Sequence, residues 1–225
     1  MNPASIKTQK GQSPQSEFRE LLDQYAGAVQ EAGVAISPYD RRELPLFTLL
    51  TPELQARAIL DVRCAVDVIQ GMKNEGHSLK DSSKYLWRTL KHLGFIPCSD
   101  IFNRITDGDV VIIYSTEHKQ VFQNLHFFEL VNLTIEELYC SEWYKYTQRP
   151  EWAQKALFEA GNAVFSGQAQ GTFDPGVEEH LAEEVNPDGG PTARLRVKVK
   201  WMSPVKKDDQ IAGVIVVNTS IPVEL

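Results

Sequence analysis

The strongest constraint on the fold is a run of alternating residues near the C-terminus, "ARLRVKVKWMSPV" at 193–205. Its apolar positions are Leu195, Val197, Val199 and Trp201, and its basic positions are Arg194, Arg196, Lys198 and Lys200. A period of two is typical of a strand with one buried and one exposed face. After the turn "KKDDQ" comes "IAGVIVVNTSI", a nearly continuous apolar run that predicts a central strand. We therefore expect a C-terminal antiparallel hairpin.

A second pair of strands is expected before the middle of the chain. "DGDVVIIYST" is a Val/Ile run bounded by turn residues, and "QVFQN" follows it after "TEHK", which predicts another hairpin. Residues 125–163 look helical, with short pieces at "HFFELV" and "TIEELY" and a longer helix from Glu151 to about Phe165. A weaker strand is expected at 168–173. This order predicts an α+β domain whose helices cover one face of an antiparallel sheet, an arrangement that favours a cavity.

The first hundred residues predict helices. Ser13 or Ser16 can cap the first helix, which Gly33 ends, and Thr51 can cap the second long one. Ser78 with Asp81 resembles a capping box for a further helix that Gly94 closes. We expect a disordered lead-in over 1–14 and an N-terminal helical region over 15–98, used as a bundle or for dimerisation.

Charge and cysteine content narrow the function classes. The 225-residue chain has a net charge of −7, and residues 101–225 supply it with 11 basic and 18 acidic side chains. This balance argues against nucleic-acid binding by that part, because phosphate contacts need clustered Lys and Arg. The cysteines Cys64, Cys98 and Cys140 are scattered and odd in number, which fits a reducing cytoplasm and predicts no metal site. No apolar run has the roughly 18 residues of a membrane span, and the N-terminus lacks a secretory signal.

The order of elements and several residues resemble the PAS domain family over about residues 105–222. The family's first motif, a strand ending in Asn followed by short helices, is matched by Asn124, Phe127, Glu129, Leu130, Thr134, Glu136, Glu137, Leu138 and Trp143. Its last hairpin is matched by "W-x-S-P-V" at 201–205 and the strand after it. The resemblance implies a five-stranded antiparallel sheet with helices on one face, preceded here by the helical region. Two family glycines are replaced, by Asn132 and Cys140, and 174–191 is an acidic insertion.

The resemblance implies a sensor, and the residues limit what it can sense. The Cys-containing run of flavin photoreceptors is absent, and the helix after Pro150 has no His for haem, so the cofactor stays unknown. No nucleophile, base and orienting group share a motif, which predicts that the chain is not an enzyme. The aromatic side chains can form either plain core or a ligand pocket. The residues predicted to line such a pocket are Phe127, Phe128, Trp143, Tyr144, Trp152 and Trp201.

We therefore expect a cytoplasmic signal-transduction protein that senses a small ligand or a partner. It would relay the signal through a homodimer or a signalling protein, with no membrane contact. One alternative is a PAS-like interaction module without a ligand. Another is a transcriptional regulator that uses residues 58–93 as a helix-turn-helix, with Lys80, Lys84, Arg88 and Lys91 on the second helix.

The basic positions of the alternating strand have a further predicted role. They can form a solvated face, bind an acidic partner, or meet the acidic segment that precedes them. In the last case we expect pairs with Glu178, Glu179, Glu183 or Glu184.

Overall fold

The computed structural model describes residues 12–37, 43–185 and 192–223. Residues 1–11 of the predicted lead-in lie outside this part of the chain. The N-terminal region contains the helices α1 (Pro14–Glu31), α2 (Pro45–Thr48), α3 (Pro52–Asn74) and α4 (Ser82–Leu93). After it come β1 (Ile96–Pro97), η1 (Phe102–Arg104), β2 (Asp109–Ser115), β3 (Gln120–Gln123), α5 (Leu125–Leu130), α6 (Ile135–Cys140), α7 (Trp143–Tyr146), β4 (Thr147–Gln148), α8 (Glu151–Phe165), β5 (His180–Glu184), β6 (Arg194–Lys207) and β7 (Gln210–Pro222).

The helix ends follow local capping chemistry. The hydroxyl of Ser13 accepts the amide N–H of Ser16, and the hydroxyl of Thr51 accepts that of Leu54, so both predicted N-caps are confirmed. Gly94 closes α4 with φ = 69°, a backbone conformation that glycine adopts without strain. The predicted cap at Ser78 was wrong. The α4 cap is Asp81, whose carboxylate accepts the amide N–H of Lys84.

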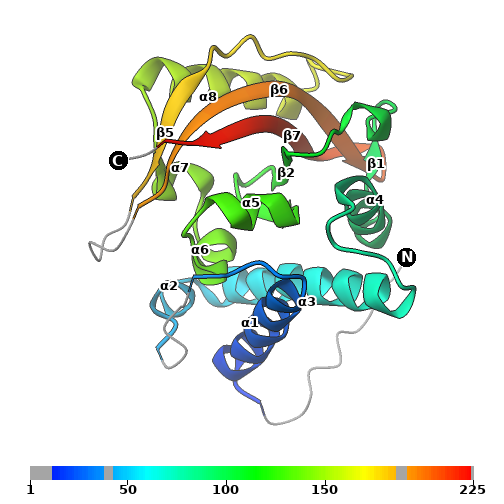
Figure 1. The fold of residues 1–225 in the computed structure, drawn as a ribbon, viewed down its shortest axis with the longest axis vertical. Helices are drawn as coiled ribbons and strands as arrows, with labels where there is room; N and C mark the ends of the chain where they lie inside the picture. The colour runs from blue at the N-terminus through cyan, green and yellow to red at the C-terminus, as the bar shows by residue number, and fades with distance from the viewer. Residues whose placement is uncertain (1–11, 38–42, 186–191, 224–225) are drawn as a thin grey trace.

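The strands form one curled antiparallel sheet in the order β3-β2-β7-β6-β5-β4, with β1 paired to β6 at the side (Figure 1). The α+β class and the N-terminal helical region are as predicted. The sheet has seven strands where five were expected, because the two-residue strands β1 and β4 add to it. Inside the sheet, β2 pairs along its whole length with β7, the last strand of the chain.

A β-bulge in β6 corrects the predicted alternation. Val199 pairs with Asn218, but Trp201 pairs with Val217, so one extra residue lies between them. Without the bulge, Trp201 would face the same side as Val199. With it, Trp201 lies on the opposite face, together with Val217. The prediction that the two apolar side chains share a face was therefore wrong for Trp201.

The acidic segment 174–191 contains β5, which pairs with β6, so its described part is not a simple inserted loop. Residues 186–191 lie outside the described part. The strand predicted at 168–173 is wrong, since only Phe173 makes an isolated bridge, to Met202.

The predicted contact between the acidic segment and the basic stripe is confirmed for two pairs. Arg194 Nε lies 2.8 Å from Glu183 Oε1, and Arg196 Nε lies 3.6 Å from Glu179 Oε1. The other two basic side chains bind elsewhere. Lys198 donates to a backbone carbonyl, and Lys200 pairs with Asp109 on β2.

The N-terminal helices and the sheet region share one hydrophobic core. The ring of Tyr25 on α1 lies 5.9 Å from that of Phe128 and 6.2 Å from that of Tyr139. The carboxylate of Glu136 on α6 accepts the amide N–H of Phe47 on α2 at 2.9 Å. The two predicted regions therefore pack against each other through buried side chains.

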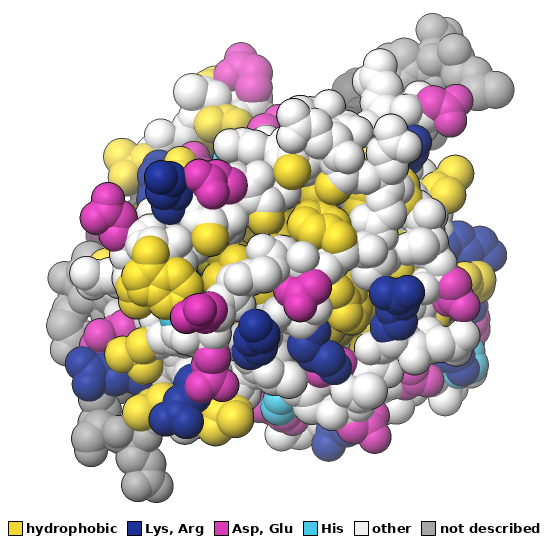
Figure 2. All heavy atoms as spheres, turned by 90° about the horizontal axis from the view of Figure 1, so that it is seen from above, with side chains coloured by type: hydrophobic (Ala, Val, Ile, Leu, Met, Phe, Trp, Pro, Cys, Tyr) yellow, Lys and Arg dark blue, Asp and Glu magenta, His cyan; other side chains and the backbone are white. Residues whose placement is uncertain are grey.

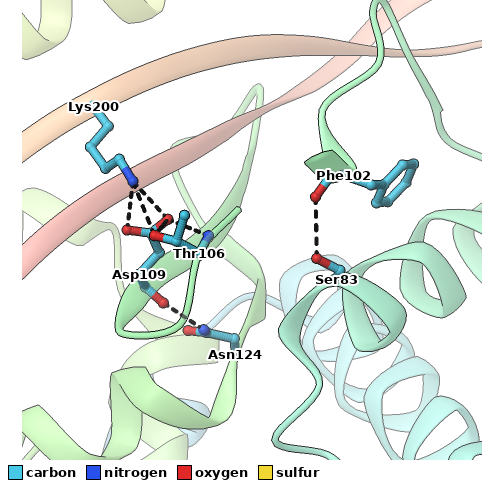
Figure 3. A network of polar contacts seen from close by, with 6 residues as sticks. All are labelled: Ser83, Phe102, Thr106, Asp109, Asn124 and Lys200. Atoms are coloured by element: carbon cyan, nitrogen blue, oxygen red, sulfur yellow. Dashed lines mark hydrogen bonds and ion pairs between the residues drawn. The ribbon is translucent and has the colours of Figure 1, made fainter. Parts of the chain in front are cut away.

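A polar network ties β2 to its surroundings (Figure 3). Asn124, fully buried, accepts the amide N–H of Val111 and donates to the carbonyl of Asp109 and to the hydroxyl of Ser82 on α4. The Asp109 carboxylate in turn accepts from Lys200 on β6 at 2.9 Å. The network joins α4, β2, β6 and the start of α5, where Asn124 is the N-cap.

Candidate ligand-binding site

Two adjoining hollows on one face of the sheet, together called the cavity, form the candidate site. The first lies beneath α8, and the second lies beside α5 and the end of α7. The volume open to the centres of water molecules is about 70 Å³ in the first and about 60 Å³ in the second. Tyr114, Arg149, Val197 and Asn218 line both and so lie at their boundary. The first hollow is further lined by His118, Trp143, Leu157, Phe158, Gly161, Phe165, His180, Val199, Met202, Val214 and Val216. The second is further lined by Val110, Ile112, Gln120, Phe127, Leu130, Val131, Leu133, Tyr146, Thr147, Ala182, Glu184, Ala193, Leu195 and Ser220.

Successive side chains of β2 point to opposite faces of the sheet, and only one of these faces lines the cavity. Ile112 and Tyr114 line the cavity, which places the residue between them, Ile113, on the other face. Ile113 pairs with Phe122 of β3, whose ring lies 4.9 Å from that of Tyr85 on α4. Thus α5, α7 and α8 border the cavity on one face, and α4 packs on the other.

Small residues and short helices leave the cavity open. Gly161 faces it from α8, and a methyl group built there would meet only the ring of Phe165, at 3.9 Å. The ring of Trp143, on the four-residue helix α7, lies 5.1 Å from that of Phe158. Seen from above, on the side of α8 and the segment after it, hydrophobic side chains are visible in the middle of the surface (Figure 2). An apolar area therefore reaches the surface on this side.

Arg149, between β4 and α8, is the main charged group of the cavity. Its Nε and Nη1 atoms are buried, and they have no hydrogen-bond partner among the described residues. The guanidinium carbon lies 5.1 Å from the ring centre of Trp143, a cation–π contact that orients the group. Burial lowers the pKa of Arg149, but an arginine keeps its charge at neutral pH.

Three more buried polar atoms at the cavity lack a partner among the described residues: the Tyr146 hydroxyl, Gln120 Oε1 and His180 Nε2. Burial raises the pKa of Tyr114 and of Tyr146, so both phenols stay protonated and can donate. His180 Nδ1 lies 3.0 Å from the carbonyl oxygen of Glu178, so this nitrogen must carry the donated proton. Burial also lowers the pKa of His180, which leaves a neutral ring with Nε2 as an acceptor.

Glu184 is the carboxylate that lines the cavity within the described residues, and it is already occupied. One oxygen accepts the amide N–H of Asn132 at 2.7 Å, and the other accepts that of Ala193 at 2.8 Å. Burial is the main cause that raises its pKa. It forms no ion pair with Arg149 in the structure as described. The positive charge of the cavity is therefore uncompensated by the described side chains.

The structure distributes the six predicted site residues over several places. Trp143 lines the first hollow and Phe127 the second. Tyr144 is in neither lining, and its ring lies 5.3 Å from that of Phe158, measured between ring centres. The other three side chains do not line the cavity. Phe128 lies in the core beside Tyr25, Trp152 is 48% exposed on α8, and Trp201 is on the opposite sheet face.

The polar side chains of the cavity are the ones that sequence reasoning missed. Tyr114 could have been found, because the alternation of β2 places it on the face of Ile112. Nothing in the sequence marks the Arg149 guanidinium as buried, since it follows a two-residue strand and precedes Pro150, the N-cap of α8.

The described residues contain neither a group of metal ligands nor a helix that could span a membrane. Within the described residues, no three His, Cys, Asp or Glu side chains are grouped so that they could hold a metal ion. Cys64 and Cys140 are buried free thiols, and burial raises both pKa values, that of Cys64 to about 12. None of the helices in the described ranges combines the length and the apolar character needed to cross a membrane.

Comparison with known proteins assigns no family. No protein-family model matches the chain, and no curated protein matches its sequence.

Proposed function

We propose that the chain is a cytoplasmic, non-enzymatic sensor protein with a PAS-like domain, and that it binds a small molecule in the cavity beneath α8. The observation that carries the proposal is the cavity itself, which combines apolar and aromatic walls with buried polar atoms that have no described partner. Ligand sites in proteins commonly have this composition. The pairing of β2 with β7, with α5, α7 and α8 bordering one face, supports the PAS-like part of the proposal.

The relay would pass from the cavity to the N-terminal helices. Phe127 lines the second hollow, and the adjacent Phe128 contacts Tyr25 of α1 in the shared core. A ligand that moves α5 therefore acts on α1 as well. The output would be a change in contacts within a homodimer or with a signalling partner. The exposed apolar side chains of Trp87 and Ile96, at the end of the N-terminal region, favour this kind of output.

The test is a screen of the full chain against a small-molecule library by thermal shift, followed by calorimetry and native mass spectrometry. The variant Gly161→Leu fills the first hollow from α8 and should abolish binding of a hit. Asn162→Leu changes the next position on the same helix, where the side chain is exposed, and should keep binding. A library without any hit, together with a bare chain in native mass spectra, would leave only the interaction module without a ligand.

DNA binding through α3 and α4 is a second candidate. It is favoured by α4, where Arg88 and Lys91 lie over the ring of the exposed Trp87. The two helices also pack into the common core, and Arg88 is paired with Glu75. A gel shift with random duplex at low salt decides between the candidates, because a DNA-binding pair must retard duplex whether or not the cavity is filled.

A further inference from the structure

We propose that the ligand of the cavity is a small monocarboxylate with an apolar body, and that Arg149 binds its carboxylate. The inference rests on the proposed function and names the chemical class that the site selects.

Arg149 carries a buried positive charge that no described side chain balances. A guanidinium cannot shed its proton at neutral pH, and burying a charge without a partner is costly. Its Nε and Nη1 atoms are both buried and unpaired among the described residues. Glu184, a carboxylate in the lining, already accepts two backbone amides. An anion from outside the described chain can therefore pair with the guanidinium. Each of its two-nitrogen edges, Nε with Nη2 and Nη1 with Nη2, matches the two oxygens of a carboxylate and includes one of the unpaired atoms.

Two phenols, Tyr114 and Tyr146, line the second hollow together with Arg149. Tyr114 and Tyr146 stay protonated because burial raises their pKa values, so each can donate a further hydrogen bond. The side chain of Gln120 acts on both phenols in the opposite direction and lowers their pKa values, but burial is the larger cause. The guanidinium and the two phenol hydroxyls are donors, whereas Gln120 Oε1 and His180 Nε2 are acceptors. The cavity therefore favours negative charge beside Arg149, where a bound cation would meet the guanidinium charge.

The single arginine and the volume of the cavity limit the charge and the size of the ligand. A single arginine balances a single negative charge. The apolar part of the first hollow is formed by Trp143, Leu157, Phe158, Val199 and Val214. The two hollows together hold roughly ten water-sized positions, if each position takes about 10–15 Å³. The best match is an organic acid of about that number of non-hydrogen atoms, with a carboxylate beside Arg149 and a hydrocarbon or aromatic body against Trp143.

The experiment compares acids with neutral isosteres on the full chain. Calorimetry would be run with benzoate, phenylacetate and 3-phenylpropanoate, with the corresponding amides, and with phenyl phosphate. We expect at least one acid to bind, with its amide at least tenfold weaker. Arg149→Met should remove this preference, and Arg149→Lys should keep part of it. Arg196→Met, on the exposed part of β6, is the matched control and should bind like the wild type.

A second readout separates ligand binding from a structural role. In the protein without added acid, Arg149→Met should leave the melting temperature unchanged or raise it, because it removes an unpaired buried charge. The acid should then raise the melting temperature of the wild type and not that of the variant.

Each contrary result has its own meaning. An amide that binds as tightly as its acid, or phenyl phosphate that binds more tightly than every acid, overturns the carboxylate class and leaves the sensor in place. An acid that binds equally to Arg149→Met, or a variant that melts well below the wild type, overturns the role of Arg149. Failure of all these compounds, with library hits that are neutral, overturns the inference alone. Failure of the whole library overturns the proposed function.

Discussion

Asn124 is the residue on which the local structure of the sheet depends most directly. Its side chain accepts the amide N–H of Val111 and donates to the hydroxyl of Ser82. It also donates to the carbonyl of Asp109, the contact drawn in Figure 3. Replacing it with Ala leaves a buried N–H and a buried carbonyl without these partners. Each such loss costs about 1–3 kcal/mol. We expect Asn124→Ala to lower the free energy of unfolding by at least that amount, measured by urea denaturation.

Ser82→Ala is the control for that substitution. It removes one of the three hydrogen bonds and leaves Val111 and Asp109 satisfied, so its effect should be the smaller of the two. Equal effects of both variants, or an Asn124→Ala protein as stable as the wild type, would contradict the role assigned to the network.

Two histidines, the buried His180 and the partly buried His118, should make stability depend on pH. Burial lowers the pKa of His180 and of His118 below the ordinary value of about 6.5. Below that value the unfolded chain binds more protons than the folded one. The free energy of unfolding should therefore fall as the pH is lowered from about 7 towards the folded-state pKa values. Chemical denaturation at several pH values measures this slope.

The variants His180→Gln and His118→Gln isolate the effect. Glu184 and Asp61 have pKa values raised by burial, and they contribute a slope of opposite sign. The informative quantity is thus the difference between the wild type and each variant, which should make the acid-side loss of stability smaller. If both variants lose stability with the same slope as the wild type, the two imidazoles are not the cause.

At the scale of elements, the long strands could be predicted and the local departures from them could not. The alternation of β6 indicated a two-faced strand, and the apolar run of β7 indicated a central one. The bulge that turns Trp201 to the other face leaves no mark in the hydrophobic pattern, because it is set by pairing with β7. β5 was missed because its sequence, "HLAEE", is short and charged, as strands near a sheet edge commonly are.

Part of the candidate site could be predicted from the sequence, and part could not. Its aromatic wall could be predicted in part, since Trp143 and Phe127 lie in the aromatic-rich segment that resembles the family motif. Its polar part comes from separate elements that only the folded sheet brings together. Gln120 belongs to β3, Arg149 follows β4, and His180 begins β5. A single sequence carries no signal for such long-range neighbours.

Gly213 tests the close packing of the central strands. It pairs with Ser115 of β2, and a methyl group added there would lie 2.5 Å from the carbonyl oxygen of Tyr114. The backbone atom cannot move without disturbing the pairing of β2 and β7. We expect Gly213→Ala to lower the free energy of unfolding by about 1–3 kcal/mol, the usual cost of overpacking.

Gly27→Ala is a matched control within α1. A methyl group there meets no atom within 4 Å, and alanine is favoured over glycine inside a helix by about 0.5–1 kcal/mol. The same denaturation measurement should therefore find this variant unchanged or more stable. A Gly213→Ala protein that is as stable as Gly27→Ala would mean that the two strands are packed less tightly than described.

For the whole molecule, the sequence predicted two regions, and the structure joins them through one core. The apolar stripe of α1 contacts rings of the sheet region, as Tyr25 does with Phe128 and Tyr139. The backbone amide of Phe47 on α2 donates to the carboxylate of Glu136 on α6. Such contacts are lost together if either region unfolds, so the full chain should unfold in one cooperative transition.

Separating the regions tests this directly. A chain of residues 95–223 would expose the apolar surfaces of α5, α6 and β3 that the N-terminal helices cover, and the buried carboxylate of Glu136 would lose the amide of Phe47. We expect this fragment to melt without a cooperative transition and to bind a hydrophobic dye. Adding residues 12–94 as a separate chain should restore the transition, because the same contacts can form between two chains. A cooperative transition of the 95–223 fragment alone, at the temperature of the full chain, would instead make the sheet region an independent domain and its packing on the N-terminal helices a secondary contact.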